Sequence, residues 1–166
     1  RNCHLVDARR LGIMLEGSGM KVQDNFLGNA GSDVVEILTG PGQISGNYAE
    51  ITGRTHVAFG SDRGNNIMMV NNTIHVMKDG DLDIGFRSWA GSKHHIVSGN
   101  VIRVDPDGKM GLAMDIRGTE TTVSSNTIQN LQENSLPLRI SAGNAIVTGN
   151  VFEHVTLTID DPSEDP

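Results

Sequence analysis

The chain has 166 residues, of which 37% are hydrophobic, with 20 glycines, one cysteine and a formal net charge of −7. The negative charge argues against nucleic acid or an anionic membrane as the main partner, because both favour clustered Lys and Arg. No apolar run approaches the length needed for insertion across a bilayer, and the single cysteine, Cys3, excludes an internal disulfide.

A short β-prone run that ends in asparagine recurs along the chain, and a second β-prone run begins immediately after each asparagine. The recurring residues are Asn25, Asn47, Asn72, Asn100, Asn126 and Asn150. Their spacing of roughly 25 residues identifies a repeat protein. Asparagine suits a corner between two strands, because it tolerates the left-handed backbone conformation and because stacked copies can hydrogen-bond along a ladder.

Each interval also contains an apolar-polar-apolar triplet, usually about ten residues after the asparagine. The triplets are 13–15, 35–37, 57–59, 82–84, 112–114, 136–138 and 157–159. Counting back one period from Asn25 places Cys3 at the corner position, so about seven coils are expected. Strand alternation predicts that the outer two residues of each triplet point into the core and that the residues beside them point outward.

This period favours an all-β parallel solenoid over residues 1–160. Leucine-rich repeats share the period but need regularly spaced leucines and a helical or 3₁₀ return arm, and propeller blades need about 40 residues each. Coils stacked about 4.8 Å apart predict a rod roughly 34 Å tall. With only four phenylalanines, its core must be a narrow stack of aliphatic side chains.

The asparagine-cornered units resemble the right-handed parallel β-helix repeat of pectate-lyase-like proteins, over residues 2 to 160. That group includes polysaccharide lyases, polygalacturonase-like hydrolases, uronan epimerases and bacteriophage tailspikes. Neither the Asn-Thr-Asp, Asp-Asp, Gly-His-Gly and Arg-Ile-Lys set of the polygalacturonases nor the Tyr-Gly-Phe-Asp-Pro-His run of the alginate epimerases is present. The resemblance therefore implies an architecture but supplies no active site.

The two ends suggest a piece of a longer protein. The chain opens with Arg1 and enters directly into a coil, whereas solenoids normally need caps over their terminal coils. Residues 161–166 depart from the repeat and are expected to be a polar tail. A soluble solenoid without caps also suggests association, for which a homotrimer is the form expected.

The outward positions beside the triplets carry charged and polar side chains. They are Glu16, Glu36, His56, Asp83, Arg87, Asp115, Arg117, Arg139 and Asp160. Acidic and basic residues stacked on one flank suit a polysaccharide groove, with carboxylates for proton transfer and arginines for acidic sugars. The alternative is a set of ordinary solvated ion pairs between strands.

Two arrangements of carboxylates are candidates for chemistry. On the triplet alignment, Asp83 and Asp115 lie on neighbouring coils two residues apart along the strand, at roughly 8 Å, within the range of an inverting glycosidase pair. The other is a column of Asp115, Arg139 and Asp160 on successive coils. The arginine in that column would keep both acids ionised, which suits binding of an anionic sugar or a lyase-type reaction.

Trp89 is the only tryptophan and lies in a Gly- and Ser-flanked stretch of the longest coil. Its ring could stack on a sugar or could pack over the base of the loop. His94 and His95 are adjacent, so on an extended strand they diverge and cannot chelate one metal. We therefore expect no metal and no cofactor.

These observations predict a protein that binds a polysaccharide outside the cell, at a cell surface or on a virion. As a hydrolase or lyase it would use Asp83 and Asp115 as acid and base. The expected substrate-binding residues are Arg87, Trp89, Arg117, Arg139, Asp160, Glu36 and His56. The alternative is a non-catalytic structural or receptor-binding shaft of a trimeric spike or adhesin.

Overall fold

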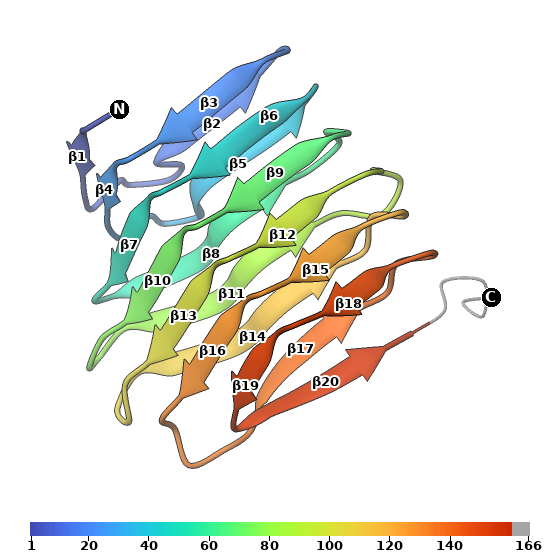
Figure 1. The fold of residues 1–166 in the computed structure, drawn as a ribbon. Coiled ribbons are helices and arrows are strands. Elements are labelled where there is room, and N and C mark those ends of the chain that lie inside the picture. Colours follow the sequence, from blue (N-terminus) through green and yellow to red (C-terminus); the bar gives the residue numbers. More distant parts are fainter. Residues whose placement is uncertain (161–166) are drawn as a thin grey trace.

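Three parallel β-sheets make up the computed structural model, which describes residues 1–160 (Figure 1). Each full coil contributes one strand to each sheet in turn, and every strand inside a sheet pairs with its equivalents on the coils above and below. The described residues form a parallel β-solenoid without a helix, so the predicted all-β solenoid is confirmed. None of residues 1–160 lies in a helix long and apolar enough to cross a membrane.

We call the three sheets the long sheet, the six-stranded sheet and the corner sheet. The long sheet consists of β2 (Ile13–Glu16), β5 (Asp33–Thr39), β8 (Arg54–Ser61), β11 (Asp81–Ser88), β14 (Lys109–Ile116), β17 (Leu136–Ile140) and β20 (Val155–Ile159). The six-stranded sheet consists of β3 (Met20–Gln23), β6 (Gly42–Ser45), β9 (Ile67–Val70), β12 (Ile96–Ser98), β15 (Thr122–Ser124) and β18 (Ile146–Thr148). The corner sheet consists of β1 (His4–Leu5), β4 (Phe26–Leu27), β7 (Tyr48–Ile51), β10 (Thr73–Val76), β13 (Val101–Val104), β16 (Thr127–Asn130) and β19 (Val151–Glu153).

The solenoid has about six turns rather than the seven expected. The last described strands, β19 and β20, begin a further turn that has no strand of the six-stranded sheet among the described residues. The predicted polar tail, 161–166, lies outside the described residues.

The asparagines form one continuous ladder inside the corner between the six-stranded and corner sheets. The Nδ2 atom of Asn72 donates to Oδ1 of Asn100 (3.1 Å) and to the Ile44 carbonyl (2.9 Å), and the Asn72 backbone N–H also donates to Oδ1 of Asn100 (2.9 Å). Asn47, Asn100 and Asn126 repeat this pattern. Each side chain thus satisfies buried backbone groups on the neighbouring coils and fixes their register.

The left-handed conformation belongs to the residue before each asparagine. Those residues are Asp24, Gly46, Asn71, Gly99, Ser125 and Gly149, with φ between 55° and 66°. The expectation that the ladder asparagines themselves adopt this conformation is therefore wrong. They occur at the corner because their amides bridge three coils.

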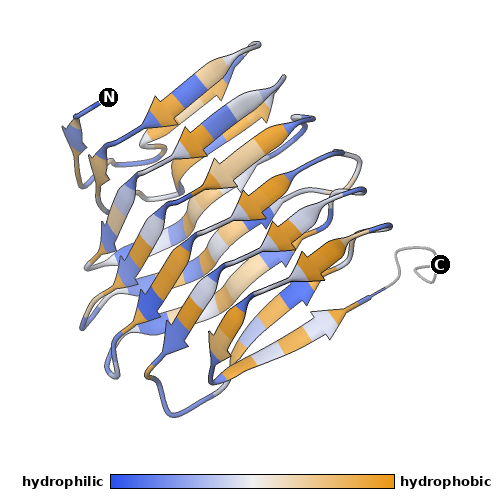
Figure 2. Cartoon of the chain, in the orientation of Figure 1, coloured by the Kyte–Doolittle hydropathy of each residue, from blue (hydrophilic) through white to orange (hydrophobic). Residues whose placement is uncertain are grey.

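The core is an aliphatic stack with one pair of phenylalanines, Phe59 and Phe86, whose ring centroids are 5.5 Å apart. Apolar and polar residues alternate along most strands (Figure 2). The triplet alignment fails in the long sheet, where Phe59 pairs with Val35 and Phe86, and Ile84 pairs with Val57. The register is thus displaced by two residues, because the turns that lead into these strands differ in length.

The same strands bend, so that two consecutive residues point inward. Ala58 and Ala113, the middle residues of their triplets, belong to the packed core cluster. Val57 is fully buried but lies outside that cluster, and Ile84 and Leu112 are half-buried. A Cβ atom on the outward Gly60 would lie 3.6 Å from Cγ1 of Val57, which places Val57 on the outer face. The expected inward orientation of residues 57, 84 and 112 is therefore wrong.

We predict that Asn100→Ala destabilises the fold by about 2–5 kcal/mol, because it leaves the Asn72 N–H and the Met69 carbonyl without their partners. Chemical denaturation followed by circular dichroism measures the change. The matched control is Asn71→Gly at the exposed left-handed position, which we expect to change stability by less than about 1 kcal/mol. Equal losses from the two variants would contradict the role assigned to the ladder.

Candidate functional site

A column of outward side chains crosses the middle of the long sheet. The register places Glu36, Gly60, Arg87, Asp115 and Arg139 at equivalent positions on successive strands, from β5 to β17. Asp33 lies beside this column, and Trp89 and Arg117 follow β11 and β14 at the next outward position. We call these residues, without Gly60, the arginine–tryptophan cluster.

Arg87 spans two rungs of the column. Its Nη2 atom donates to Oδ2 of Asp33 (2.7 Å) and to Oε1 of Glu36 (3.0 Å), both on β5, and so passes over β8. Gly60 leaves the room for this, because a Cβ atom there would lie 3.0 Å from Oδ2 of Asp33 and 3.4 Å from Nη2 of Arg87. The three charged side chains are largely buried, and burial together with the charge of Asp33 raises the pKa of Glu36.

Asp115 binds two arginines at once. Nε and Nη2 of Arg117 donate to its two oxygens at 3.1 and 2.9 Å, and the same atoms of Arg139 donate at 3.0 and 3.0 Å. Burial alone would raise the pKa of Asp115, but the hydrogen bonds and charges of Arg139 and Arg117 outweigh it and lower that pKa. Asp115 is thus a buried carboxylate that orients two partly exposed guanidinium groups.

Trp89 contacts two of these arginines. The guanidinium carbons of Arg87 and Arg117 are each 5.1 Å from the centre of its ring, within the range of a cation–π contact. The Ser92 hydroxyl donates to the Trp89 carbonyl at 2.7 Å and fixes the turn. Trp89 remains 36% exposed, so part of an immobilised aromatic ring is open to a ligand.

The register separates the two proposed catalytic aspartates. Asp115 pairs with Arg87, four residues along the strand from Asp83, so the two carboxylates are roughly 14 Å apart. The expected spacing of 8 Å is therefore wrong. Asp83 instead accepts hydrogen bonds from Arg54 (2.7 Å) and His56 (2.8 Å) at the opposite end of β11. Burial alone would raise the pKa of Asp83, but the hydrogen bonds from His56 and Arg54 outweigh burial and lower that pKa.

The proposed column of Asp115, Arg139 and Asp160 is broken at its last member. Thr158 is the residue that pairs with Arg139, and Asp160 follows β20 and accepts a hydrogen bond from Ser141 at 3.3 Å. His56 likewise lies away from the column, with Asp83. Of the nine predicted site residues, the structure therefore brings Glu36, Arg87, Trp89, Asp115, Arg117 and Arg139 together and leaves Asp83, His56 and Asp160 apart.

Sequence patterns missed Asp33, Gly60 and the outward apolar row of Val57, Ile84 and Leu112. The signal for the row is the pair of adjacent apolar residues in Ala58-Phe59 and Ala113-Met114, which breaks strand alternation. Asp33 and Gly60 carry no such signal, because their roles depend on which residue lies two rungs away.

His95 is buried in the core next to the Trp89 turn. Its Cδ2 atom and the Ser92 hydroxyl would lie within 3 Å of a Cβ atom on Gly118, and neither of its ring nitrogens has a hydrogen-bond partner among the described residues. Burial, with a contribution from the charge of His94, lowers the pKa of His95 to about 4, although the Gly64 backbone opposes the shift. His94 makes a separate surface ion pair with Glu120 at 3.0 Å.

Within residues 1–160, no three His, Cys, Asp or Glu side chains gather in a way that could hold a metal ion. Comparison of the chain with protein-family models, curated proteins and solved structures finds no match. Any functional assignment therefore depends on the geometry of the cluster.

We predict that Gly60→Leu destabilises the protein by about 3–5 kcal/mol, because it displaces Arg87 from Asp33 and Glu36 and leaves buried charges without partners. Trp89 fluorescence should change at the same time, since Arg87 contacts its ring. The control is Gly53→Leu, where a Cβ atom would lie no closer than 3.6 Å to its neighbours and where a much smaller effect is expected. Unchanged stability and fluorescence in Gly60→Leu would contradict the bridge across two rungs.

We also predict a pH dependence of stability from His95. Because its pKa is about 4 in the folded protein and 6.5 when unfolded, the unfolded state takes up the proton first, and stability is lost as the pH falls from 6.5 to 4. The expected loss is about 3 kcal/mol. His95→Leu should remove this contribution, so the stability of the variant relative to wild type, measured by denaturation at each pH, should rise by about 3 kcal/mol as the pH falls from 6.5 to 4.

The control is Thr121→Val, a buried neighbour of His95 on the next rung that does not titrate. Its difference from wild type should stay constant across the same pH series. If the difference between His95→Leu and wild type is also constant, the assigned burial of a neutral imidazole is wrong.

Proposed function

We propose that this protein binds an acidic polysaccharide across the outer face of the long sheet, at the arginine–tryptophan cluster. The observation that carries the proposal is the partly exposed Trp89 side chain, whose ring lies 5.1 Å from the guanidinium carbons of Arg87 and Arg117. The C–H face of a sugar ring stacks on such a surface. The neighbouring guanidinium groups provide bidentate donors for a carboxylate or sulfate on the same glycan.

The hydrogen bonding of the arginines supports an anionic ligand. Arg117 and Arg139 use Nε and Nη2 for Asp115, and Nη1 of each makes no hydrogen bond to any described residue. Arg117, Arg139 and Asp115 together carry a net charge of +1, whereas Arg87, Asp33 and Glu36 together carry −1. The positive charge of the cluster therefore lies at its Asp115 end. An acidic sugar next to Trp89 would thus meet donors whose geometry is already fixed, which lowers the entropic cost of binding.

Binding is better supported than cleavage. A general acid needs a raised pKa, whereas ion pairs lower the pKa values of Asp83 and Asp115. Glu36 has a raised pKa, but Arg87 covers it. Hydrolysis or β-elimination with Asp83 and Asp115 as acid and base is therefore the weaker form of the proposal.

The resemblance to pectate-lyase-like proteins agrees with this function, since many of them act on acidic polysaccharides. Membership of that superfamily and a location outside the cell, at a cell surface or on a virion, belong to the same proposal. The competing proposal is a non-catalytic shaft of a homotrimeric spike or adhesin. It is favoured by the pairing of every charge in the cluster with another charge of the same chain.

The test is titration of the protein with polygalacturonate and alginate, using dextran as the neutral comparison. We expect binding to the acidic polymers that weakens with salt. Trp89→Ala and Arg139→Gln should each weaken it about 10-fold, or roughly 1.4 kcal/mol. The control is Arg54→Gln, which removes an exposed arginine at the other end of the strands and should leave affinity unchanged.

Reducing-end release is measured in the same mixtures. Release that Asp115→Asn or Asp83→Asn abolishes would support the catalytic form, and binding without release would support the non-catalytic one. If neither these polymers nor a glycan array gives a ligand whose binding depends on Trp89, the proposed function is wrong.

A further inference from the structure

From its second coil onward, one broad face of the solenoid lacks charge. The first coil departs from this pattern, because Lys21 and Asp24 occupy the equivalent positions. Three parts of each coil contribute to this face. They are the outward residues of its strand in the six-stranded sheet, the corner residues, and the first residue of the following strand in the corner sheet. The segments 43–48, 68–73, 96–101, 122–127 and 146–151 contain no Asp, Glu, Lys, Arg or His. We call the surface formed by their outward side chains the uncharged face.

The uncharged face is continuous across two sheets. The register aligns Gln43, Met68, Ile96, Thr122 and Ile146 in one column and Tyr48, Thr73, Val101, Thr127 and Val151 in another. Between them lies a column of small side chains, Ser45, Val70, Ser98, Ser124 and Thr148. Each strand of the six-stranded sheet runs on into the corner sheet without reversing (Figure 1), so the columns share one side of the molecule.

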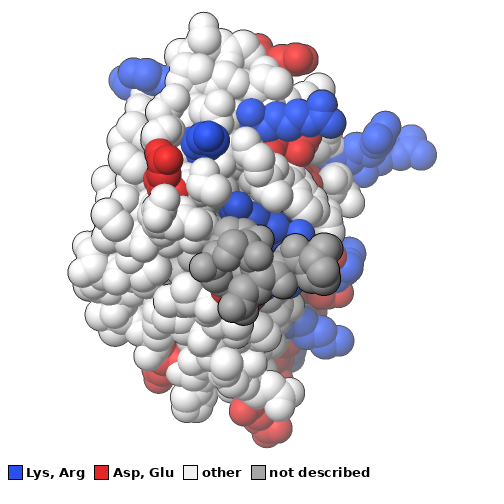
Figure 3. All heavy atoms as spheres, turned by 90° about the vertical axis from the view of Figure 1, so that its right-hand side faces the viewer, with Lys and Arg blue, Asp and Glu red and all other residues white. Residues whose placement is uncertain are grey.

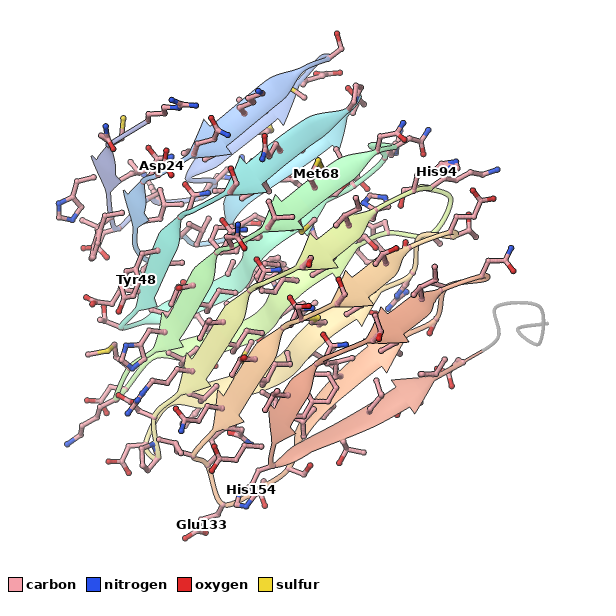
Figure 4. The ribbon with its side chains drawn as sticks, viewed as in Figure 1. Asp24, Tyr48, Met68, His94, Glu133 and His154 are labelled. Carbon is pink, nitrogen blue, oxygen red and sulfur yellow. The ribbon has the colours of Figure 1, made fainter. Side chains whose placement is uncertain are left out.

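Exposed apolar residues gather on this face. Met68, Ile96, Val101, Ile146 and Val151 are among the large hydrophobic residues that remain exposed in the described chain. Figure 4 shows Met68 on β9, within the face, and His94, Glu133 and His154 at turns around its margins. In Figure 3 most Lys and Arg side chains lie toward one side of the view, and the other side shows fewer charged groups, of both signs.

We propose that the uncharged face is an interface with a second copy of this chain, related by a two-fold axis perpendicular to the face. Two copies that each carry a net charge of −7 approach most favourably where neither presents a charge. A two-fold contact requires a self-complementary surface. Columns of serine, threonine and short aliphatic residues meet this requirement, because they place no unpaired charge in the contact.

The size of the face fits such a contact. About five rungs spaced 4.8 Å apart, and a width of about six residues, give roughly 25 by 20 Å. Two copies would bury roughly 1,000 Å² in total, at the lower limit for specific interfaces. The geometry thus assigns a concentration-dependent dimer, in which the arginine–tryptophan cluster of each copy stays open on the opposite side.

The test is sedimentation equilibrium of the whole chain over a range of micromolar concentrations. We expect a monomer–dimer equilibrium. Ile96→Lys with Val101→Lys, at two outward positions that are 38% and 39% exposed, should raise the dimer dissociation constant at least about 100-fold, because like charges face each other across the axis. The control is Met14→Lys at a 53% exposed position of the long sheet, which should leave the dissociation constant unchanged.

Ser98 identifies the axis, because it lies on the middle rung of the face. In a Cys3→Ser background, which removes the exposed native thiol, Ser98→Cys should form a disulfide-linked dimer under mild oxidation. A chain that stays monomeric to about 100 µM would overturn the proposal. Larger oligomers that persist in the double-lysine variant would also overturn it, since they would point to association elsewhere. Neither result depends on glycan binding.

Discussion

The asparagine ladder is the interaction on which the rest of the structure depends. Each amide accepts from the backbone of the preceding corner and donates to a carbonyl further back, so an error of one residue in any coil would leave buried groups on three coils unpaired. The ladder therefore holds the register while the intervals vary between 22 and 28 residues. Insertions are confined to the turns, and outward side chains of distant segments fall into fixed columns.

The arginine–tryptophan cluster is a consequence of those columns. Asp33 and Arg87 are 54 residues apart in sequence and meet only because two rungs separate them and Gly60 leaves the intervening position empty. Asp115 holds Arg117 and Arg139 in the same way, one within its own coil and one on the next. Acidic and basic residues alternate along the column, and their ion pairs hold the long arginine side chains in fixed positions. These side chains therefore lose less entropy when a ligand binds.

The sequence predicted the parts of the structure that repeat and failed where one coil differs from the next. The recurring asparagines predicted a parallel solenoid, because that follows from the period alone, whereas strand alternation placed Ile84 and Leu112 wrongly in the core. The register of the long sheet was wrong by two residues at Phe59 and Phe86, since turn lengths cannot be read from strand patterns. Because of that error, the predicted register placed Asp83 too close to Asp115. Only the coordinates show that Arg87 is the neighbour of Asp115.

The distribution of charge makes the two sides of the solenoid suited to different kinds of partner. The interior positions of the described coils are filled mainly by aliphatic side chains, so the two proposed contacts use outer faces. On the long sheet, paired charges surround an aromatic ring, and a polyanion can exchange water for guanidinium contacts there. On the uncharged face, nothing attracts an ion, and burial of Ile96 and Val101 is the available source of free energy. The proposed binding of a glycan and the proposed association of copies would therefore not compete, because they draw on different side chains and on different forces.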